Sequence, residues 1–295
     1  MVFKMKDLYI SKSKTDLPIM KPFIIRESRY GNLSKWLVTF SPGIFIFLTL
    51  IAISWPFFSF GQNNYTIKTA FDALIKWIPF LFWGGFLFNI LISLFAMLFG
   101  TLAGAILGLG QLSQIYTIRT ISWFFTQLFR NSPWLVILFI VLLAFPFEVI
   151  IFGYIISIPD WMKAVFGLSL PVMANISEIV RGAVLSVPKG QWEAAESLAF
   201  SRLQILWKII LPQCFKRMIP PWMNWYAILT MATPLCSLLG VEEIITLSRQ
   251  AMEAENNHPE LLIPFYSFAL ALFFIYCYPI AKFTVYLEKK YSVKL

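Results

Sequence analysis

Six long apolar runs constrain this 295-residue chain more than any other feature of its sequence. An α-helix needs about 20 apolar residues to cross the hydrocarbon core of a bilayer, and each run reaches that length. Helices satisfy their own backbone hydrogen bonds, whereas a barrel requires short alternating strands, which this pattern lacks. The sequence therefore predicts an all-α polytopic membrane bundle with spans at 38–60, 78–109, 120–147, 164–187, 218–241 and 262–287.

The composition supports an integral membrane protein. Hydrophobic residues make up 59% of the chain and charged residues 13%, with a mean hydropathy of +0.73. Soluble domains carry about 25% charged residues. The three cysteines lack CxxC spacing and His258 is the single histidine, which argues against a disulfide framework, a zinc site or a histidine-based catalytic cluster.

The basic residues predict the orientation of the bundle. If the N-terminus is placed in the cytoplasm, only Lys68, Lys76, Lys163 and Arg249 fall outside, and the other 20 of the 24 basic residues fall inside. Cytoplasmic loops carry such an excess, which also attracts anionic lipid. Topology and membrane lipid thus account for the net charge of +9, and nucleic acid is not expected as a partner.

The same pattern divides the chain into parts. Residues 1–37 form a basic cytoplasmic tail. The run at 38–60 is an extra N-terminal span, because it is too long for a signal-peptide core and no Ala-x-Ala site follows it. Residues 78–287 form the core of the bundle with a cytoplasmic loop at 188–217, and residues 288–295 form a second cytoplasmic tail.

The loop at 188–217 has the pattern of two short helices joined by a turn. Pro188 suits the first turn of a helix, where the N–H that it lacks has no partner. Helix-favouring residues follow through Leu198. Ser201 and Gln204 then have the spacing of a capping box, which predicts the start of a second helix.

This pair of helices is predicted to form a rigid unit at the membrane surface. Ala194 and Ala195 are expected to keep one side of it narrow enough to enter a groove, with Glu193 and Glu196 flanking that side. The second helix is expected to end at the break formed by Leu211-Pro212. The alternative is a surface loop with ordinary helix formers.

Four blocks of the sequence resemble permease subunits of ABC importers. The cytoplasmic loop matches that family's signature of Glu-Ala-Ala, three residues, a small residue, nine residues, Ile, one residue and Leu-Pro. Ser-Glu-Ile-Val-Arg-Gly at 177–182, followed by Ser-Val-Pro-Lys-Gly-Gln at 186–191, is similar to the polar amino acid uptake branch, as are Arg-Asn-Ser-Pro at 130–133 and Ser-Leu-Leu-Gly-Val-Glu at 237–242. The resemblance covers residues 80–287 and implies a type I importer permease fold, with a five-span core and an extra N-terminal span.

The resemblance also implies which residues carry the function. ATPase coupling is expected at Gly190, Gln191, Glu193, Ala194, Ala195, Ala199, Ile209, Leu211 and Pro212. Polar residues inside or at the ends of spans are candidates for the substrate path, because intramembrane ionisable groups are usually functional. They are Asn89, Asn175, Glu178, Arg181 and Thr233.

Four positions depart from the family pattern. Ala199 stands where the family has a glycine suited to a left-handed turn, and Asn175 stands where it has a tyrosine. Met231-Ala232 replaces a Lys-Asp pair. Glu178 and Arg181 are also spaced to pair with each other, which would give them a structural role.

The implied assembly requires other subunits. This chain lacks a GxxxxGK[ST] phosphate loop, so ATP and Mg are expected to be used by two ATPase subunits, with no cofactor and no metal in this chain. The other expected partners are a second permease subunit, identical or related, and a soluble solute-binding protein. The expected function is import of a polar or charged amino acid across a bacterial inner membrane.

Other functions remain open from the sequence. A permease for a different small solute shares the loop pattern. A secondary transporter usually shows repeated halves and buried carboxylates, whereas here no repeat is visible and Glu178 is the one candidate acid. A membrane scaffold that transports nothing is a third alternative.

Two further patterns predict packing and bending. Ala96, Gly100, Gly104 and Gly108 recur every four residues, which allows close helix contact either within one subunit or between subunits. Four prolines interrupt the predicted spans, and Pro133 and Pro234 are the most expected hinges. The four prolines are Pro133, Pro171, Pro234 and Pro279.

The stretch 242–260 is predicted to lie outside the membrane. It holds five glutamates against Arg249, and the apolar side chains of 244–247 and Met252 favour a surface helix over the outer mouth. The functional interpretation is a landing surface for a binding protein, and the alternative is a solvated loop.

Overall fold

The computed structural model describes residues 66–151 and 154–291. By length and composition, three helical stretches can cross a membrane, and two bent helix pairs raise the number of spans in these residues to as many as five. The three are Ile67–Gln111, Asp160–Leu185 and Pro259–Tyr291. The predicted tail 1–37 and the predicted span 38–60 lie outside the described residues.

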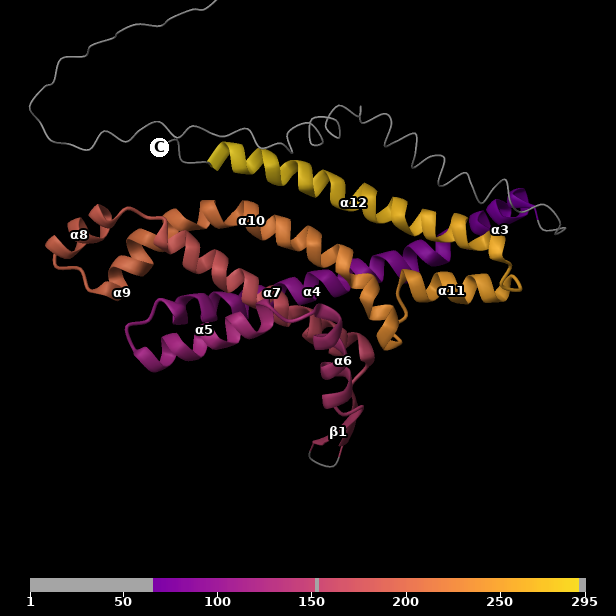
Figure 1. Cartoon of the computed structure of the whole chain (residues 1–295), viewed down its shortest axis with the longest axis horizontal. Helices are drawn as coiled ribbons and strands as arrows, with labels where there is room; N and C mark the ends of the chain where they lie inside the picture. The colour runs from indigo at the N-terminus through magenta and orange to yellow at the C-terminus, as the bar shows by residue number, and fades with distance from the viewer. Residues whose placement is uncertain (1–65, 152–153, 292–295) are drawn as a thin grey trace, which may run out of the picture. The chain divides into compact units, whose positions relative to one another are not determined.

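Most of the described chain is helical (Figure 1). The first half contains α3 (Ile67–Phe80), the π-helical segment η1 (Leu81–Phe86), α4 (Leu87–Gln111), α5 (Tyr116–Arg130), α6 (Trp134–Ala144), β1 (Glu148–Ile151) and β2 (Tyr154–Ser157). The second half contains α7 (Asp160–Leu185), α8 (Lys189–Ser197), α9 (Arg202–Ile205), the π-helical segment η2 (Leu206–Ile210), α10 (Leu211–Ala232), the 3₁₀ segment η3 (Thr233–Leu239), α11 (Ile244–Ala254), the 3₁₀ segment η4 (Pro259–Leu261) and α12 (Leu262–Tyr291).

The closest packing in the bundle joins α4 to α7. A Cβ atom added at Gly104 would lie 2.6 Å from the carbonyl oxygen of Met173, and one added at Gly108 would lie 2.8 Å from that of Ser177. Only glycine therefore allows the two backbones to approach this closely. The small-residue repeat thus packs within one subunit, and the core extends from it through Ile92 and Leu168.

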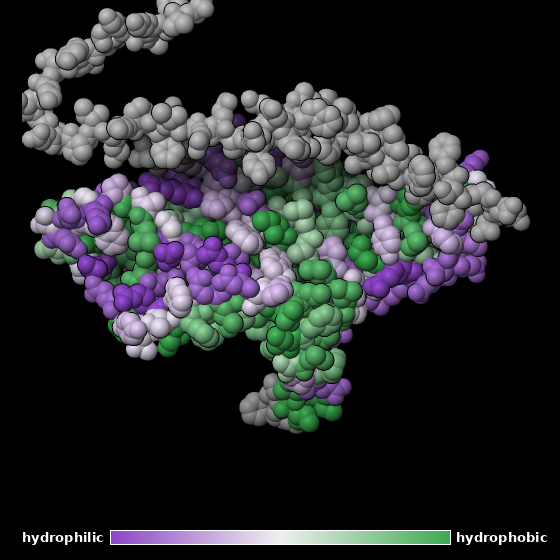
Figure 2. All heavy atoms as spheres, in the orientation of Figure 1, coloured by the Kyte–Doolittle hydropathy of each residue, from purple (hydrophilic) through white to green (hydrophobic). Residues whose placement is uncertain are grey.

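The other faces of these helices are apolar and exposed. On α4, Leu98, Leu102 and Ile106 are exposed. Figure 2 shows hydrophobic residues gathered where Figure 1 places α6. A lipid environment accounts for this surface, because soluble proteins rarely expose contiguous apolar patches of this extent. The membrane assignment is confirmed by these long apolar helices.

The predicted span 120–147 is interrupted at Pro133, one of the positions where the sequence predicts a hinge. The structure divides it into α5 and α6, which meet at 106°. Pro133 lies at this break and directly precedes α6. Proline cannot donate an N–H to the preceding turn, so the helix ends before it. A second bend of 50° separates the α10 region from α11, where Pro234 begins η3, while Pro171 and Pro279 lie inside continuous helices.

A short β-hairpin was not predicted from the sequence. Strands β1 and β2 pair antiparallel with Val149 opposite Ile156 and Ile150 opposite Ile155. The β-branched residues in both strands favour extended backbone. Because the apolar run before it resembles a membrane helix, the hairpin could not be separated from the end of that run by composition alone.

We predict that Gly104→Ala destabilises the protein. The added methyl group would press on the carbonyl of Met173, and overpacking of this kind costs about 1–3 kcal/mol. The melting temperature of purified protein in detergent should therefore fall. Gly182→Ala in α7 is the matched control, because no atom lies within 4 Å of the position that its methyl group would occupy, and it should leave the melting temperature unchanged or raise it. Equal melting temperatures for the two variants would contradict the packing argument.

Candidate functional site

Residues 188–217, the predicted coupling loop, contain the two helices that the sequence predicts. Helix α8 begins directly after Pro188. At the start of α9, the backbone N–H of Ser201 donates to Gln204 Oε1 at 2.9 Å, and the N–H of Gln204 donates to Ser201 Oγ at 3.4 Å. The predicted capping box is therefore confirmed.

The turn between these helices keeps the left-handed geometry despite the missing glycine. Ala199 has a φ of 58°, which costs an alanine about 1 kcal/mol relative to a right-handed conformation. The turn is held because the N–H of Ala199 donates to the carbonyl of Glu196 at 2.9 Å, and that of Phe200 donates to the carbonyl of Ala195 at 3.3 Å. The side chain of Phe200 also packs against the loop's own apolar core.

The two central alanines do not share one face, so that prediction is wrong. Ala195 is 3% exposed and packs with Ile205 and Ile210 inside the loop, whereas Ala194 is exposed. Neighbours one position apart on a helix point about 100° away from each other, which is why they separate. The outward face instead holds Ala194 with polar and small neighbours. They are Gly190, Gln191 and Glu193.

The second helix does not end at Leu211-Pro212, which corrects the sequence prediction. Helix α9, η2 and α10 follow one another without a gap, and Pro212 lies in the first turn of α10. Pro212 has no backbone N–H to donate to the preceding turn. The wider hydrogen-bond pattern of the π-helical segment η2 accommodates this missing donor. The side chain of Gln213 donates to the carbonyl of Ile209 at 2.9 Å. The coupling loop therefore leads directly into a membrane span.

Two of the predicted path residues meet in a buried polar junction. Asn89 Nδ2 donates to Thr233 Oγ1 at 2.9 Å and to Glu243 Oε2 at 3.0 Å, and Asn89 Oδ1 accepts from the N–H of Ile244 at 3.1 Å. All three side chains are 0% exposed. Asn89 thereby joins α4, η3 and the start of α11.

Glu243 belongs to this junction but was predicted to lie on the exposed outer stretch. Its Oε1 accepts from the backbone N–H groups of Ile245 and Thr246, both at 3.0 Å, so it caps α11. A carboxylate at a helix N-terminus interacts favourably with the helix dipole. An acidic residue directly before an amphipathic run was the signal that could have identified it.

The remaining path residues lie in other contacts. Asn175 Nδ2 donates to the carbonyl of Pro171 in its own helix at 2.8 Å. Glu178 accepts from Arg181 at 2.7 Å, as the sequence spacing predicted, and lies 3.6 Å from Arg130 of α5. The sequence did not indicate this contact with Arg130.

A second buried polar set lies beside Glu178. Gln111 Nε2 donates to Ser177 Oγ at 2.8 Å and to Thr126 Oγ1 at 3.2 Å, and Thr126 and Ser177 are 3.0 Å apart. These bonds link α4, α5 and α7 where the three helices converge. Buried polar groups need such partners, especially where lipid excludes water.

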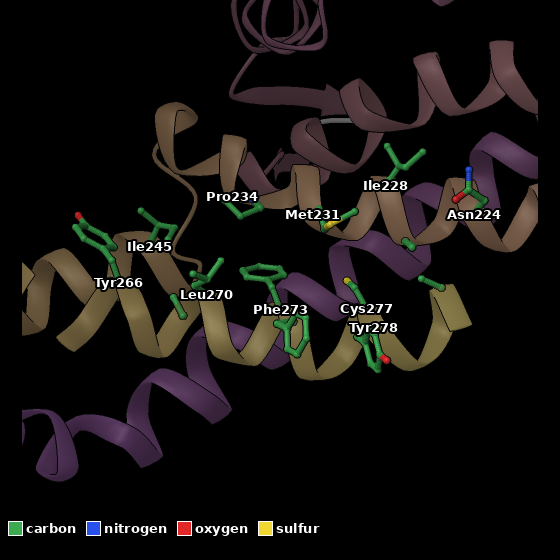
Figure 3. A pocket seen from close by; sticks show the side chains of 14 residues that line it. Asn224, Ile228, Met231, Pro234, Ile245, Tyr266, Leu270, Phe273, Cys277 and Tyr278 are labelled. Atoms are coloured by element: carbon green, nitrogen blue, oxygen red, sulfur yellow. The ribbon is translucent and has the colours of Figure 1, made fainter. Parts of the chain in front are cut away.

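An apolar pocket of about 580 Å³ lies between α10, α11 and α12 (Figure 3). Met231, which replaces a charged residue of the family pattern, lines it together with Phe273 and Cys277. Asn224 supplies a polar group at one end. An apolar side chain at position 231 therefore suits its surroundings.

The outer stretch forms the predicted helix, α11, but its carboxylates are not all available to solvent. Glu243 and Glu260 are buried. Glu255 accepts from Lys76 Nζ at 2.7 Å and from Trp77 Nε1 at 2.9 Å, and these hydrogen bonds hold the pKa of Glu255 below its usual range. Glu253 remains exposed. The charge offered to a partner is thus smaller than the sequence indicated.

These features define a polytopic membrane protein with a two-helix loop between two of its candidate spans. The chain belongs to the family of binding-protein-dependent transport system inner membrane components, whose pattern matches residues 100–291. It is a permease subunit of the ABC importer class.

Individual relatives agree with this assignment. The chain is 31% identical over 195 residues to the L-cystine transport system permease protein TcyB of Bacillus subtilis, covering 66% of this chain and 80% of that one. It is 33% identical over 205 residues to the probable amino-acid ABC transporter permease protein YckA of the same organism, covering 70% and 86%. Its fold matches the crystal structure of an amino acid ABC transporter with histidines at a TM-score of 0.62 and 22% identity, covering 75% of this chain and 98% of that one.

We predict that Asn89→Ala lowers the stability of the protein. The change leaves the N–H of Ile244 and the carboxylate of Glu243 short of a partner, and each unsatisfied buried group costs about 1–3 kcal/mol. Thermal unfolding in detergent should show a clear drop in melting temperature. Asn224→Ala removes the same group from an exposed position in α10 and should change little. If both variants melt like the wild type, the junction does not stabilise the bundle.

Proposed function

We propose that this chain forms the translocation path for a polar or charged amino acid that a soluble solute-binding protein delivers, and that both of its termini lie in the cytoplasm. The observation that carries the proposal is the coupling loop, a two-helix unit with its own apolar core that continues into α10. The relatives named as amino acid permeases support the substrate class.

The loop is suited to transmit a movement of the ATPase. Its exposed surface includes the apolar side chains of Leu198, Leu203 and Trp207, which can bury against a cleft in another protein. Because α9, η2 and α10 are continuous, a displacement of the docked loop would move α10 with it. ATP and Mg act in the partner subunit, and closure there would shift the population of permease states.

The substrate path in this proposal runs between α7 and α10 of two permease subunits. Glu178 and Arg181 are partly exposed and available to line it. Asn89 and Thr233 are buried and would position the outer part of the path through the junction with α11. Asn175 lies on α7 between these two levels.

The outer helix α11 is proposed as the landing surface for the binding protein. Its exposed carboxylate, Glu253, can contribute to electrostatic steering, which is screened over about 8 Å at physiological salt. Glu255 instead ties the end of α11 to α3.

Reconstitution tests this function directly. The permease, its ATPase and its binding protein would be assembled in liposomes, and uptake of labelled amino acids would be measured with and without ATP and with and without the binding protein. The proposal expects uptake of at least one amino acid that requires both. ATP-dependent uptake of an unrelated solute, with none of any amino acid, would overturn the substrate class.

We predict that Ala194→Trp uncouples transport while Ala195→Trp destabilises the chain. Ala194 is exposed on the docking face, so a large side chain there should block contact with the ATPase without disturbing the fold. Ala195 is buried, and overpacking it costs about 1–3 kcal/mol. Melting temperature, co-purification of the ATPase and ATP-driven uptake separate the two effects. Normal uptake in the Ala194→Trp variant would place the docking surface elsewhere.

A further inference from the structure

Helix α5 has three distinct faces. Ser122 and Thr126 are buried against α4 and α7. A second face is apolar and exposed, with side chains that suit lipid. They are Ile118, Ile121, Phe124, Phe125 and Leu128. The third face carries side chains with polar atoms at positions three, four or seven residues apart, which lie on one side of a helix. They are Tyr116, Arg119, Thr120, Trp123, Gln127 and Arg130.

The polar face of α5 opens onto a recess of about 510 Å³ beside α7. Glu178 and Arg181 of α7 form the opposite wall, and Gln111 closes the end. Figure 2 shows hydrophilic residues gathered in the area where Figure 1 places α5 and α7. A polar stripe on a membrane helix must face protein or water rather than lipid, and within the described residues the recess leaves this stripe open to water.

The recess carries an excess of positive charge. Glu178 is its one carboxylate, and Arg181 and Arg130 lie 2.7 Å and 3.6 Å from it. Arg119 also faces the recess, and within the described residues no carboxylate lies within 4.0 Å of its guanidinium. The guanidinium of Arg119 instead lies over the ring of Tyr116, with 5.8 Å between the guanidinium carbon and the ring centroid.

We infer that this recess is the inner part of the transport route and that Arg119 binds the carboxylate of the passing substrate. This inference rests on the proposed import of amino acids. A guanidinium forms short, charge-assisted hydrogen bonds to a carboxylate in a fork geometry. Because Glu178 is already paired with Arg130 and Arg181, it offers little to a cationic substrate. The route therefore favours zwitterionic and anionic amino acids over cationic ones.

The guanidinium of Arg119 is also able to bind an anionic lipid headgroup, since positive residues gather at the inner membrane surface. The recess favours the substrate because Thr120 and Gln127 also line it and add neutral hydrogen-bonding groups to the guanidinium of Arg119. They suit a small polar solute inside a pocket.

Transport by the complete importer in liposomes of zwitterionic lipid tests the inference. Uptake of labelled glutamate, glutamine and arginine would be compared for the wild type, Arg119→Gln and the control Lys282→Gln, which removes the same charge from an exposed site on α12. Loss of a charge-assisted hydrogen bond should raise the KM for any transported zwitterionic or anionic amino acid about tenfold in Arg119→Gln and leave Lys282→Gln unchanged. An effect that appears only after anionic lipid is added would assign Arg119 to lipid and overturn the inference.

Thiol labelling tests the recess without relying on uptake. In a variant without the native cysteines, Thr120→Cys should react faster with a negatively charged thiol reagent than with a positively charged one, and Arg119→Gln should remove that preference. Equal reactivity with both reagents would contradict a cationic aqueous recess.

If the wild-type importer moves no amino acid at all, the proposed function fails. If it does, and Arg119→Gln matches Lys282→Gln, only the inference fails.

Discussion

The close contact between α4 and α7 is the interaction on which the other helices depend. Gly104 and Gly108 of α4 lie against the backbone carbonyls of Met173 and Ser177 in α7. A Cβ atom at either glycine would collide with these carbonyls, so no larger residue fits there. Between membrane helices, lipid removes most of the hydrophobic driving force, so close packing and hydrogen bonds stabilise the bundle. Helices α5, α6 and α10 all pack against the pair that this contact creates.

Two buried polar sets stabilise the bundle at different levels of α4. Asn89 near its start holds η3 and the capped end of α11, and Gln111 at its end holds α5 and α7. Leaving any of these groups unpaired in a low-dielectric interior would cost far more than an ordinary hydrogen bond contributes. Helix α4 therefore links α11 to the helices next to the loop at 188–217.

The family assignment relates these contacts to transport. The chain belongs to the ABC importer permeases, and the coupling that we propose requires a movement of its loop at 188–217 to reach the spans. The continuous run from α9 through α10 provides a mechanical connection, and the bends at Pro133 and around η3 are the places where spans can change direction. The junction of Asn89, Thr233 and Glu243 lies next to the second bend.

The sequence by itself determined the membrane class, the positions of most spans, the two helices of the coupling loop and the family, because apolar run length, the capping residues and motif spacing are local properties. It also indicated the pairing of Glu178 with Arg181, which are three residues apart on one helix. Only the tertiary structure decided that Glu243 is buried, that Ala195 faces inward and Ala194 outward, and that Arg130 joins Glu178. Each of these outcomes depends on which residues of other helices pack against the side chain. Residue type and periodicity say which face of a helix is polar, but not whether lipid, water or another helix covers it.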